Sequence, residues 1–174
     1  MENHYRIINA RPDDVSAIGH IELAAANLLK GYAPDEVLQQ TTAELELQRA
    51  QAEGRLWVAL AGETPIGFAH VEVFDPISVH LEEIDVHPDH GRRGVGTKLV
   101  TTVCRWAWKR GYRAVTVTTF RDVPWNMPFY LRLGFEEIPK QSLTPDLRSI
   151  LRNEARRGLD SSRRVAMKWM VPFI

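Results

Sequence analysis

The spacing of apolar residues predicts strands and helices over most of the chain. Apolar residues that recur every three or four positions indicate a helix with one buried face, and strict alternation indicates a strand with one buried face. Strands are therefore expected near residues 5–8, 56–60, 66–74, 79–86, 114–119, 135–138 and 164–170, and helices near residues 13–30, 35–53, 95–110 and 124–133.

The order of these elements predicts an α/β protein whose sheet mixes parallel and antiparallel strands. A short turn at 61–65 joins two strands as in a β-hairpin. The strands at 79–86 and 114–119 are separated by a helix, and a connection of this length joins parallel neighbours. Because no repeat or linker interrupts the pattern, we expect a single domain over residues 1–174, large enough to bury about 70% of its unfolded surface.

A further helical spacing falls within residues 139–162 and carries a row of arginines. Arg148, Arg152 and Arg156 lie four positions apart, and like charges at this spacing mildly oppose a helix. We favour a solvated face with local acidic partners over a site for an acidic ligand. Those acidic partners are Asp146, Glu154 and Asp160.

A glycine-rich segment connects the strand at 79–86 to the helix that begins near residue 95. Gly94 and Gly96 leave little side-chain bulk over the start of this helix. Free backbone N–H groups and the positive end of the helix dipole can therefore hold an anion there. The segment is typical of a phosphate-binding loop.

Two common phosphate motifs do not fit this segment. A Walker A loop beginning at Gly91 would need Lys directly after Gly96, but Thr97 stands there and Lys98 follows. A dinucleotide-binding loop would need a third glycine where Leu99 stands, and an acidic residue closing the next strand, which the chain lacks.

The remaining pattern is x-x-Arg-x-Gly-x-Gly after a strand that ends in Val-x-Pro. This pattern resembles the signature loop of the GNAT superfamily of N-acetyltransferases, which holds the pyrophosphate of acetyl-CoA. The segment Trp125 to Phe135 resembles the Phe-Tyr-x-x-x-Gly-Phe element of the same family. The family usually has Gln or Arg where this chain has Gly91. Since the family binds phosphate mostly through backbone N–H groups, the loss of that side chain is expected to weaken the loop without abolishing binding. Arg92 or Arg93 can supply charge in its place.

The resemblance implies a GNAT fold, which is a twisted mixed sheet of six or seven strands with helices on both faces. It also implies that acetyl-CoA is the co-substrate and that its acetyl group moves directly to an amine, without a covalent enzyme intermediate. By the same resemblance, Leu28, Tyr32 and Pro34 are candidates to line the acceptor pocket. The residues expected to bind acetyl-CoA are Ile84, Asp85, Val86, Gly91, Arg92, Arg93, Gly94, Val95, Gly96, Thr97, Asn126 and Tyr130.

Acetyl transfer from a thioester needs a proton for the departing thiolate and hydrogen bonds for the oxyanion. The resemblance places Tyr130 beside the sulfur, where a phenol can act as the general acid. It also places a free backbone N–H of the segment 84–86 beside the oxyanion, because in the family this strand splays from its neighbour. Asn126 resembles family asparagines that contact the cofactor.

The general base is expected to be a carboxylate, because an amine with a pKa near 10 is mostly protonated at neutral pH. Glu82 and Glu83 occupy successive strand positions, so at most one is expected to face the site. We prefer Glu83, with Glu82, His80 and Asp85 as alternatives. Together with Asp122 after the next strand, these carboxylates favour an acceptor that carries a cation.

The composition limits the kinds of partner and the location that we expect for this protein. Lys plus Arg and Asp plus Glu both number 22, so no basic excess favours nucleic acid. The chain has one cysteine, which is expected to be a buried hydrophobe on the helix near 104, and no signal-peptide core. No apolar run reaches about 20 residues, so no membrane span is expected and the cytoplasm is the expected location.

The expected partner is a small-molecule or peptide amine, and a homodimer is left open. No metal is expected, because His80, His87 and His90 match no zinc spacing. The competing class is a non-catalytic acyl-CoA-binding regulatory domain, which would need neither Tyr130 nor an acidic base. A protein that binds nucleic acid through the arginine row is a third class. The presence of both Tyr130 and a candidate base favours an enzyme.

Overall fold

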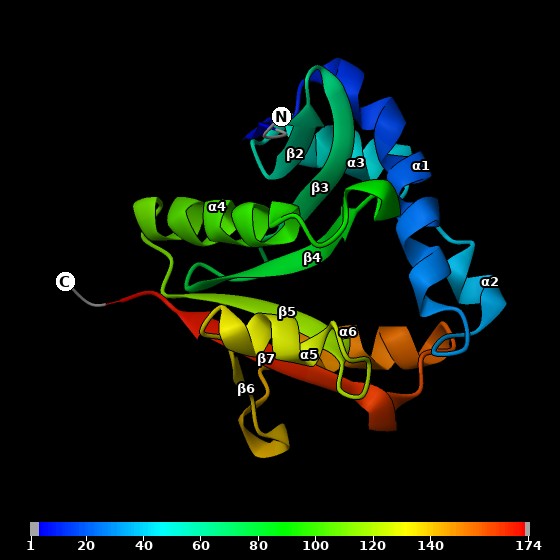
Figure 1. The fold of residues 1–174 in the computed structure, drawn as a ribbon. Coiled ribbons are helices and arrows are strands. Elements are labelled where there is room, and N and C mark those ends of the chain that lie inside the picture. The colour runs from blue at the N-terminus through cyan, green and yellow to red at the C-terminus, as the bar shows by residue number, and fades with distance from the viewer. Residues whose placement is uncertain (1–3, 173–174) are drawn as a thin grey trace.

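The computed structural model describes residues 4–172, which form a mixed sheet of seven strands (Figure 1). The strand order is β1-β2-β3-β4-β5-β7-β6, and the β4–β5 pair is parallel while the other neighbours are antiparallel. The α/β class and the mixed sheet expected from the sequence are confirmed. The strands are β1 Tyr5–Asn9, β2 Leu56–Ala61, β3 Thr64–Glu72, β4 Ser78–Val86, β5 Ala114–Phe120, β6 Glu136–Glu137 and β7 Arg164–Met170.

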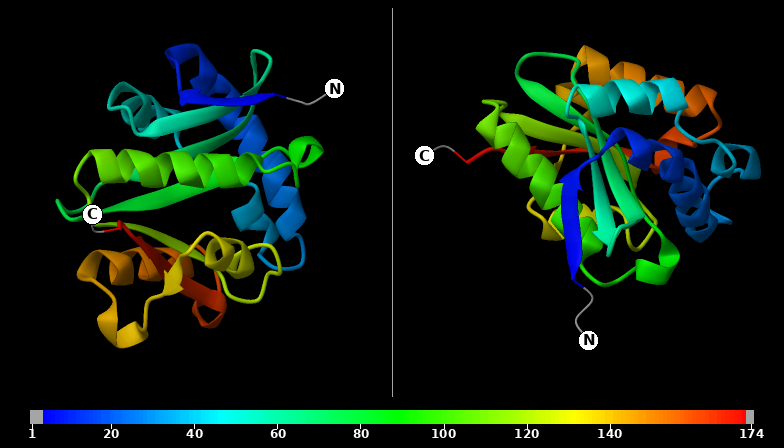
Figure 2. Two further views of the ribbon diagram at one scale, coloured as in Figure 1. Left: turned by 60° about the vertical axis from the view of Figure 1, so that its left-hand side comes forward. Right: turned by 90° about the horizontal axis from the view of Figure 1, so that it is seen from above.

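Helices cover both faces of the sheet (Figure 2). Helices α4 and α5 lie on one face, and α1, α3 and α6 lie on the other. None of the described helices is long and apolar enough to cross a bilayer. The α-helices are α1 Val15–Ala26, α2 Asp35–Leu38, α3 Glu44–Ala52, α4 Val95–Lys109, α5 Met127–Arg132 and α6 Pro145–Arg156. The 3₁₀ turns are η1 Pro12–Asp14, η2 Asn27–Leu29, η3 Pro88–His90, η4 Lys140–Ser142 and η5 Ser161–Arg163.

Each face of the sheet has its own apolar core. Under α4, the buried residues Leu99 and Val103 pack with Val115 and other sheet residues. Under α1 and α3, the core is centred on residues such as Phe68. Because close-packed interiors deform little, α4 holds its first turn at a fixed place beside the sheet.

The sheet splits between β4 and β5. The two strands pair only where Ser78–His80 lies opposite 114–116, although β4 continues to Val86 and β5 to Phe120. Figure 1 shows the two strands diverging beyond this point. Backbone groups of β4 that face the split therefore have no partner strand, which the sequence had suggested only through the family resemblance.

A β-bulge in β4 overturns the expectation that only one of Glu82 and Glu83 faces the site. His70 lies opposite Glu83, but the next residue of β3 lies opposite Leu81. The extra residue shifts the alternation of side chains by one position. Val79 and Leu81 pack under α4, and so do Ile84 and Val86. His80, Glu82, Glu83 and Asp85 consequently project from the opposite face of the strand.

The helix expected over residues 35–53 is two helices, α2 and α3, separated by residues 39–43. The Glu22 carboxylate on α1 accepts both the backbone N–H and the hydroxyl of Thr42, at 3.0 Å and 2.6 Å. These bonds replace the helical bond that the Thr42 N–H would make, so the segment turns instead of continuing. The strand expected at 135–138 is also shorter, since only Glu136–Glu137 pair with β7.

Candidate active site

The glycine-rich loop folds as a turn that opens directly into α4. Gly94 adopts a left-handed conformation with φ of 78° and is the N-cap of the helix. The first intrahelical bond in this turn runs from the Lys98 N–H to the Gly94 carbonyl at 3.0 Å. The N–H groups of residues 95–97 therefore have no helical acceptor and point out of the helix start. A Cβ at Gly94 would meet no atom within 4 Å, so the space above the turn is open to an anion.

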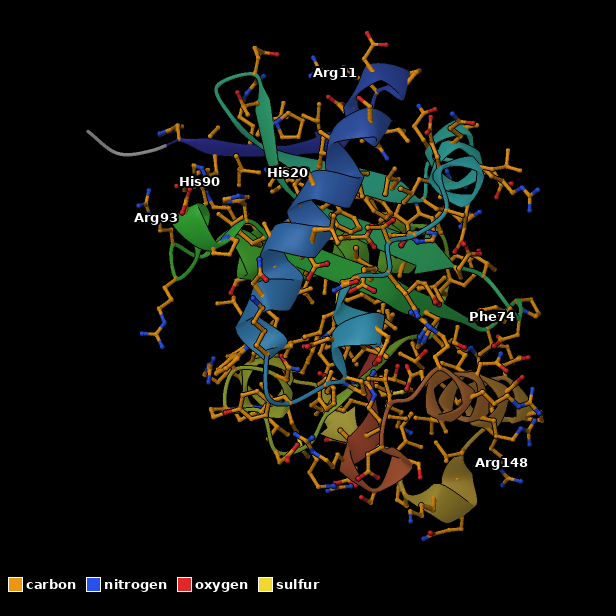
Figure 3. All side chains as sticks on the ribbon, turned by 90° about the vertical axis from the view of Figure 1, so that its right-hand side faces the viewer. Arg11, His20, Phe74, His90, Arg93 and Arg148 are labelled. Carbon is orange, nitrogen blue, oxygen red and sulfur yellow. The ribbon has the colours of Figure 1, made fainter. Side chains whose placement is uncertain are left out.

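The side chains of the loop tie it to neighbouring elements. Arg93 donates to the Tyr5 hydroxyl at 3.1 Å, and His90 Nδ1 lies 3.2 Å from the same oxygen. Figure 3 shows His90 and Arg93 together at one edge of the molecule. On the inner side, Gly96 faces the ring of Phe129 on α5, because a Cβ there would lie 3.5 Å from that ring. The loop, β1 and α5 thus share one packed corner.

A cavity of about 490 Å³ occupies the split in the sheet. Helices α1 and α2 and strand β4 form one wall, and β5 and α6 form the other. Asn126 and Tyr130 close the cavity from the opposite side of the sheet. The charged residues that line it are Glu22, Glu82, Glu83, Asp85, Asp146, Glu154, Arg157 and Arg164. Carboxylates outnumber guanidinium groups, so the cavity is acidic.

The carboxylates of β4 bind protons unusually tightly. Burial, followed by the charges of Glu46 and Glu72, raises the pKa of Glu82 to about 7, although 34% of its side chain is exposed. Burial and the charges of Glu22 and Glu82 raise the pKa of Glu83 above its usual range. Asp85 shares a hydrogen bond with Glu83, and burial together with that neighbour raises its pKa as well. Glu82 and Glu83 therefore change protonation near neutral pH, as a general base should.

Sequence reasoning missed Glu22, which contributes a further carboxylate from α1. Glu22 is 7% exposed. Burial raises the pKa of its carboxyl group, and the hydrogen bonds from Thr42 lower that pKa. An available signal was its position directly after Ile21, on the apolar stripe that also includes Ile18 and Ala25. An acidic residue on such a stripe is rare unless it is paired or functional.

An ion pair occupies the α6 side of the cavity. Arg164 Nε donates to Glu154 Oε2 at 3.0 Å, and the two side chains are 10% and 12% exposed. The Thr118 hydroxyl donates to the other oxygen of the Glu154 carboxylate. Arg157 contacts the α2 side by donating to Gln40 Oε1 at 3.1 Å. The bonds of Glu154 hold α6 to β5 and β7 on one side of the cavity, and the Arg157 bond joins this side to the segment after α2.

Tyr130 is 6% exposed and reaches the cavity from α5. Burial raises the pKa of its hydroxyl, and the charges of Glu83 and Asp85 raise it further. The phenol therefore keeps its proton at neutral pH and can donate it. Asn126 lines the same end of the cavity, so the structure brings both residues together with the carboxylates of β4.

Three residues expected in the acceptor pocket do not line the cavity. Leu28, Tyr32 and Pro34 lie outside it, whereas Leu29 and Ala33 line it, as do Val37 and Leu38 of α2. The 3₁₀ turn η2 at the end of α1 has three residues per turn, which rotates the following side chains relative to a continued α-helix. These three candidates therefore lie outside this cavity, although the segment that carries them borders it.

The expectation that Asp122 adds to the acidity of the site is also wrong. Its carboxylate does not line the cavity and pairs with Arg163, whose Nε lies 2.8 Å from Asp122 Oδ2. The salt bridge satisfies this carboxylate outside the split.

The arginine row lies on the exposed side of α6, but the expected local partners do not pair with it. Glu154 binds Arg164, and Asp160 accepts bonds from Ser162. Within residues 4–172, no ion pair is formed by the arginines of the row, which are Arg148, Arg152 and Arg156. Figure 3 places Arg148 at the outer edge of the molecule, on the side opposite His90 and Arg93.

The histidines named as metal candidates do not form a ligand set. His80 is buried and bonded to the Thr116 hydroxyl at 2.9 Å, and burial lowers its pKa to about 4, which also argues against a role as base. His87 and His90 lie apart from it in the loop, with ring centroids 6.4 Å from each other. Cys104 is buried, and burial raises the pKa of its thiol to about 12, as expected for an unreactive thiol.

A different group of metal-ligand type forms between α3 and β3. Ligand atoms of Glu46, His70 and Glu72 lie within 4.8 Å of one another. Glu72 Oε1 already lies 2.8 Å from His70 Nε2 and 3.1 Å from Arg55 Nη1. The Arg55 guanidinium therefore already pairs with one of the three residues.

The site combines three features. A helix N-terminus is open to an anion, the sheet splits beside it, and a phenol and carboxylates lie in the split. Together these are the features of an N-acetyltransferase fold. The chain belongs to the acetyltransferase (GNAT) family, whose sequence profile matches residues 22–135. This establishes the family that the two motifs had suggested.

Similar proteins agree with this assignment. An uncharacterised N-acetyltransferase of Methanocaldococcus jannaschii is 33% identical over 93 residues, covering 49% of this chain and 40% of that protein. Mycothiol acetyltransferase of Streptomyces avermitilis is 37% identical over 67 residues, covering 38% of this chain and 22% of that protein. The chain therefore matches less than half the length of either relative.

The fold itself is similar to that of the PaiA N-acetyltransferase from Thermoplasma acidophilum, solved in complex with coenzyme A. The TM-score is 0.75 at 13% identity, and the match covers 96% of this chain and 99% of that one.

Proposed function

We propose that this protein transfers the acetyl group of acetyl-CoA directly to an amine acceptor that carries a further positive charge. The observation that carries this proposal is the cavity in the split sheet, where Tyr130 and the carboxylates of β4 face the same space next to a helix N-terminus. The pyrophosphate of acetyl-CoA would bind the loop at residues 91–97, and the thioester would enter the split beside residues 84–86.

The open backbone at Gly94 supports this placement of the pyrophosphate. Side-chain charge is secondary, because Arg93 is held by Tyr5 while Arg92 is exposed. The free N–H groups of the first turn of α4 would carry most of the binding.

The first prediction concerns this loop. Acetyl-CoA at a hundredfold excess over its dissociation constant should stabilise the fold by about 2.7 kcal/mol. Gly94→Glu should abolish this stabilisation, because it places bulk and negative charge in the anion site. Thermal unfolding with and without acetyl-CoA measures the effect.

Gly94→Ala is the matched control for that experiment. It carries the same left-handed backbone strain, about 1–2 kcal/mol, without the charge, and should keep most of the ligand-induced shift. A folded Gly94→Glu protein with the full shift would show that the pyrophosphate binds elsewhere.

Three groups of the chain supply the chemistry of the transfer. Glu83, as a carboxylate, takes a proton from the acceptor amine, whose nitrogen then forms a bond to the carbonyl carbon. A free N–H of the segment 84–86 donates to the oxyanion. As the carbon–sulfur bond breaks, Tyr130 gives its proton to the departing sulfur and recovers one from the nitrogen of the new amide. Free CoA thiol and the acetylated amine are released, and Glu83 passes its proton to water.

The second prediction tests the acid. Tyr130→Phe keeps the ring and its packing but removes the only proton that the side chain can donate. Turnover should fall on the order of a hundredfold, while the affinity for acetyl-CoA stays nearly unchanged. Release of CoA thiol measures turnover, and unchanged turnover in an assay limited by the chemical step would remove Tyr130 from the mechanism.

The third prediction tests the base. A base acts when deprotonated, and the pKa of Glu83 is raised to about 8, so kcat should rise with pH through neutrality and level off above about pH 9. Glu83→Gln should lose this rise and lower kcat on the order of a hundredfold. Measuring both proteins with one acceptor cancels the titration of the acceptor itself.

Glu82→Gln is the control for the base, because Glu82 projects from the same face and its pKa is raised to about 7. It should keep the rise of kcat with pH. If Glu82→Gln loses the rise and Glu83→Gln keeps it, the base is Glu82.

The excess of carboxylates in the cavity supports a cationic acceptor. Arg164 neutralises Glu154, but no arginine or lysine among residues 4–172 pairs with Glu82 or with the pair Glu83–Asp85, which face the cavity. A positive group on the acceptor would complete the charge balance of these residues.

The fourth prediction uses acceptors that differ only in a remote group that is cationic, neutral or anionic. The cationic member should have the lowest KM, on the order of tenfold below the neutral one. Arg148→Ala should not change this order, because Arg148 lies outside the cavity. A preference for the anionic member that Arg148→Ala or Arg152→Ala removes would assign the acceptor to the arginine row instead.

These measurements also separate the enzyme from a regulatory domain. A protein that shows the full stabilisation by acetyl-CoA but releases CoA thiol with no member of an amine panel would be an acyl-CoA-binding domain.

A further inference from the structure

Arg163 lies outside the cavity yet joins three segments that surround it. Its Nη1 donates to the backbone carbonyl of Tyr32 at 2.6 Å, and its Nε donates to Asp122 Oδ2 at 2.8 Å. The guanidinium also lies over the ring of Phe120, 5.4 Å from its centroid, and 5.8 Å from that of Tyr32. One side chain from the turn before β7 therefore binds the segment after α1 and the end of β5.

The segment that Arg163 binds, residues 30–38, forms part of the cavity wall made by α1, α2 and β4. We call the part of that wall formed by residues 30–38 the acceptor wall. Ala33, the residue after Tyr32, lines the cavity, and so do Val37 and Leu38 of α2. The residues of this segment are exposed or half-buried, and within residues 4–172 none of them belongs to an apolar core. Arg163 bonds Tyr32 within it, and Arg157 bonds Gln40 just beyond α2. The position of the segment therefore depends on a few directed bonds rather than on an apolar core.

The same contacts continue to the helix that bears Tyr130. The ring of Tyr32 packs edge-on against Trp125, with centroids 5.7 Å apart. Trp125 directly precedes Asn126, which lines the cavity, and α5 follows at once. Asp122 lies at the start of the same connection. Arg163 thus holds residues 30–38 and the connection between β5 and α5 in fixed positions relative to each other.

We propose that Arg163 is a positioning residue for the acceptor, which fixes the segment at residues 30–38 against the end of β5 so that the cavity is preformed. This inference rests on the proposed function, because it assigns the cavity to the acceptor. Arg163 does not touch the cavity and acts through Tyr32 and Asp122.

The sign of the effect separates positioning from simple electrostatics. If Arg163 acted only through its charge, its removal would make the cavity more negative and lower KM for a cationic acceptor. If it positions the wall, its removal must raise KM, because the acceptor then has to order the segment as it binds.

The test compares Arg163→Met with the native protein. Methionine keeps an apolar stem beside Phe120 but loses every hydrogen bond, so KM for the cationic acceptor should rise about tenfold. The value of kcat at saturating acceptor and the affinity for acetyl-CoA should change less than about twofold. Arg163→Lys keeps the charge and can pair with Asp122 but cannot fork to both partners, so it should restore only part of the loss.

Arg121→Met is the matched control. Arg121 lies directly after β5 and pairs with Glu137 at 3.1 Å, as Arg163 pairs with Asp122, but it does not line the cavity or contact Tyr32. Its substitution should leave KM unchanged. Asp122→Asn should raise KM in part, and the double variant with Arg163→Met should be no worse than Arg163→Met alone, because both act on one contact.

Hydrogen exchange provides a readout that needs no turnover. In Arg163→Met, amides of residues 30–38 should exchange faster, while those of α4 stay protected. If exchange at 30–38 is unchanged, or if KM for the cationic acceptor falls, the positioning role is wrong. If exchange rises as expected but the native protein acetylates no amine, the positioning contact stands and the proposed function fails instead.

Discussion

The structure depends on the loss of pairing between β4 and β5. Two parallel strands remain together only over residues 78–80 of β4, and beyond this point the sheet opens. An open sheet edge inside a protein would normally be costly, because each unpaired backbone group must find another partner. Here the edge borders a cavity that Tyr130 enters from one face of the sheet and carboxylates enter from the other. The split is thus what allows groups from both faces to meet.

The carboxylates create a second constraint. Unpaired charges in a partly closed space repel one another, and the protein responds in different ways at different positions. Glu154 is paired with Arg164, and Glu22 accepts two bonds from Thr42. Glu83 and Asp85 instead share a hydrogen bond, and their pKa values are raised. Within residues 4–172 no arginine or lysine pairs with Glu83 or Asp85, and the charges of these two carboxylates also act on Tyr130. They form the part of the cavity best suited to proton transfer.

The two sides of the site are held by different forces. The glycine loop is fixed by α4, whose apolar face is buried in the larger core, and by the contact of Gly96 with Phe129. The acceptor wall has little apolar core of its own and is held by directed bonds from Arg157 and Arg163. A rigid cofactor side and a polar, adjustable acceptor side allow one fold to keep its donor chemistry while the acceptor wall differs.

Local pattern was enough to determine the α/β class, the loop between β4 and α4, and the motif that contains Tyr130, because each depends on residues close together in the chain. Only the tertiary structure decided which side chains meet. The bulge in β4 turned Glu82 and Glu83 to one face, and a 3₁₀ turn moved Ala33 rather than Tyr32 into the cavity. The Asp122 carboxylate lies outside the cavity because it pairs with Arg163, a residue distant in sequence. A shift of one residue reverses the facing of a side chain, and a distant ion pair leaves no local pattern, so neither can be deduced from periodicity.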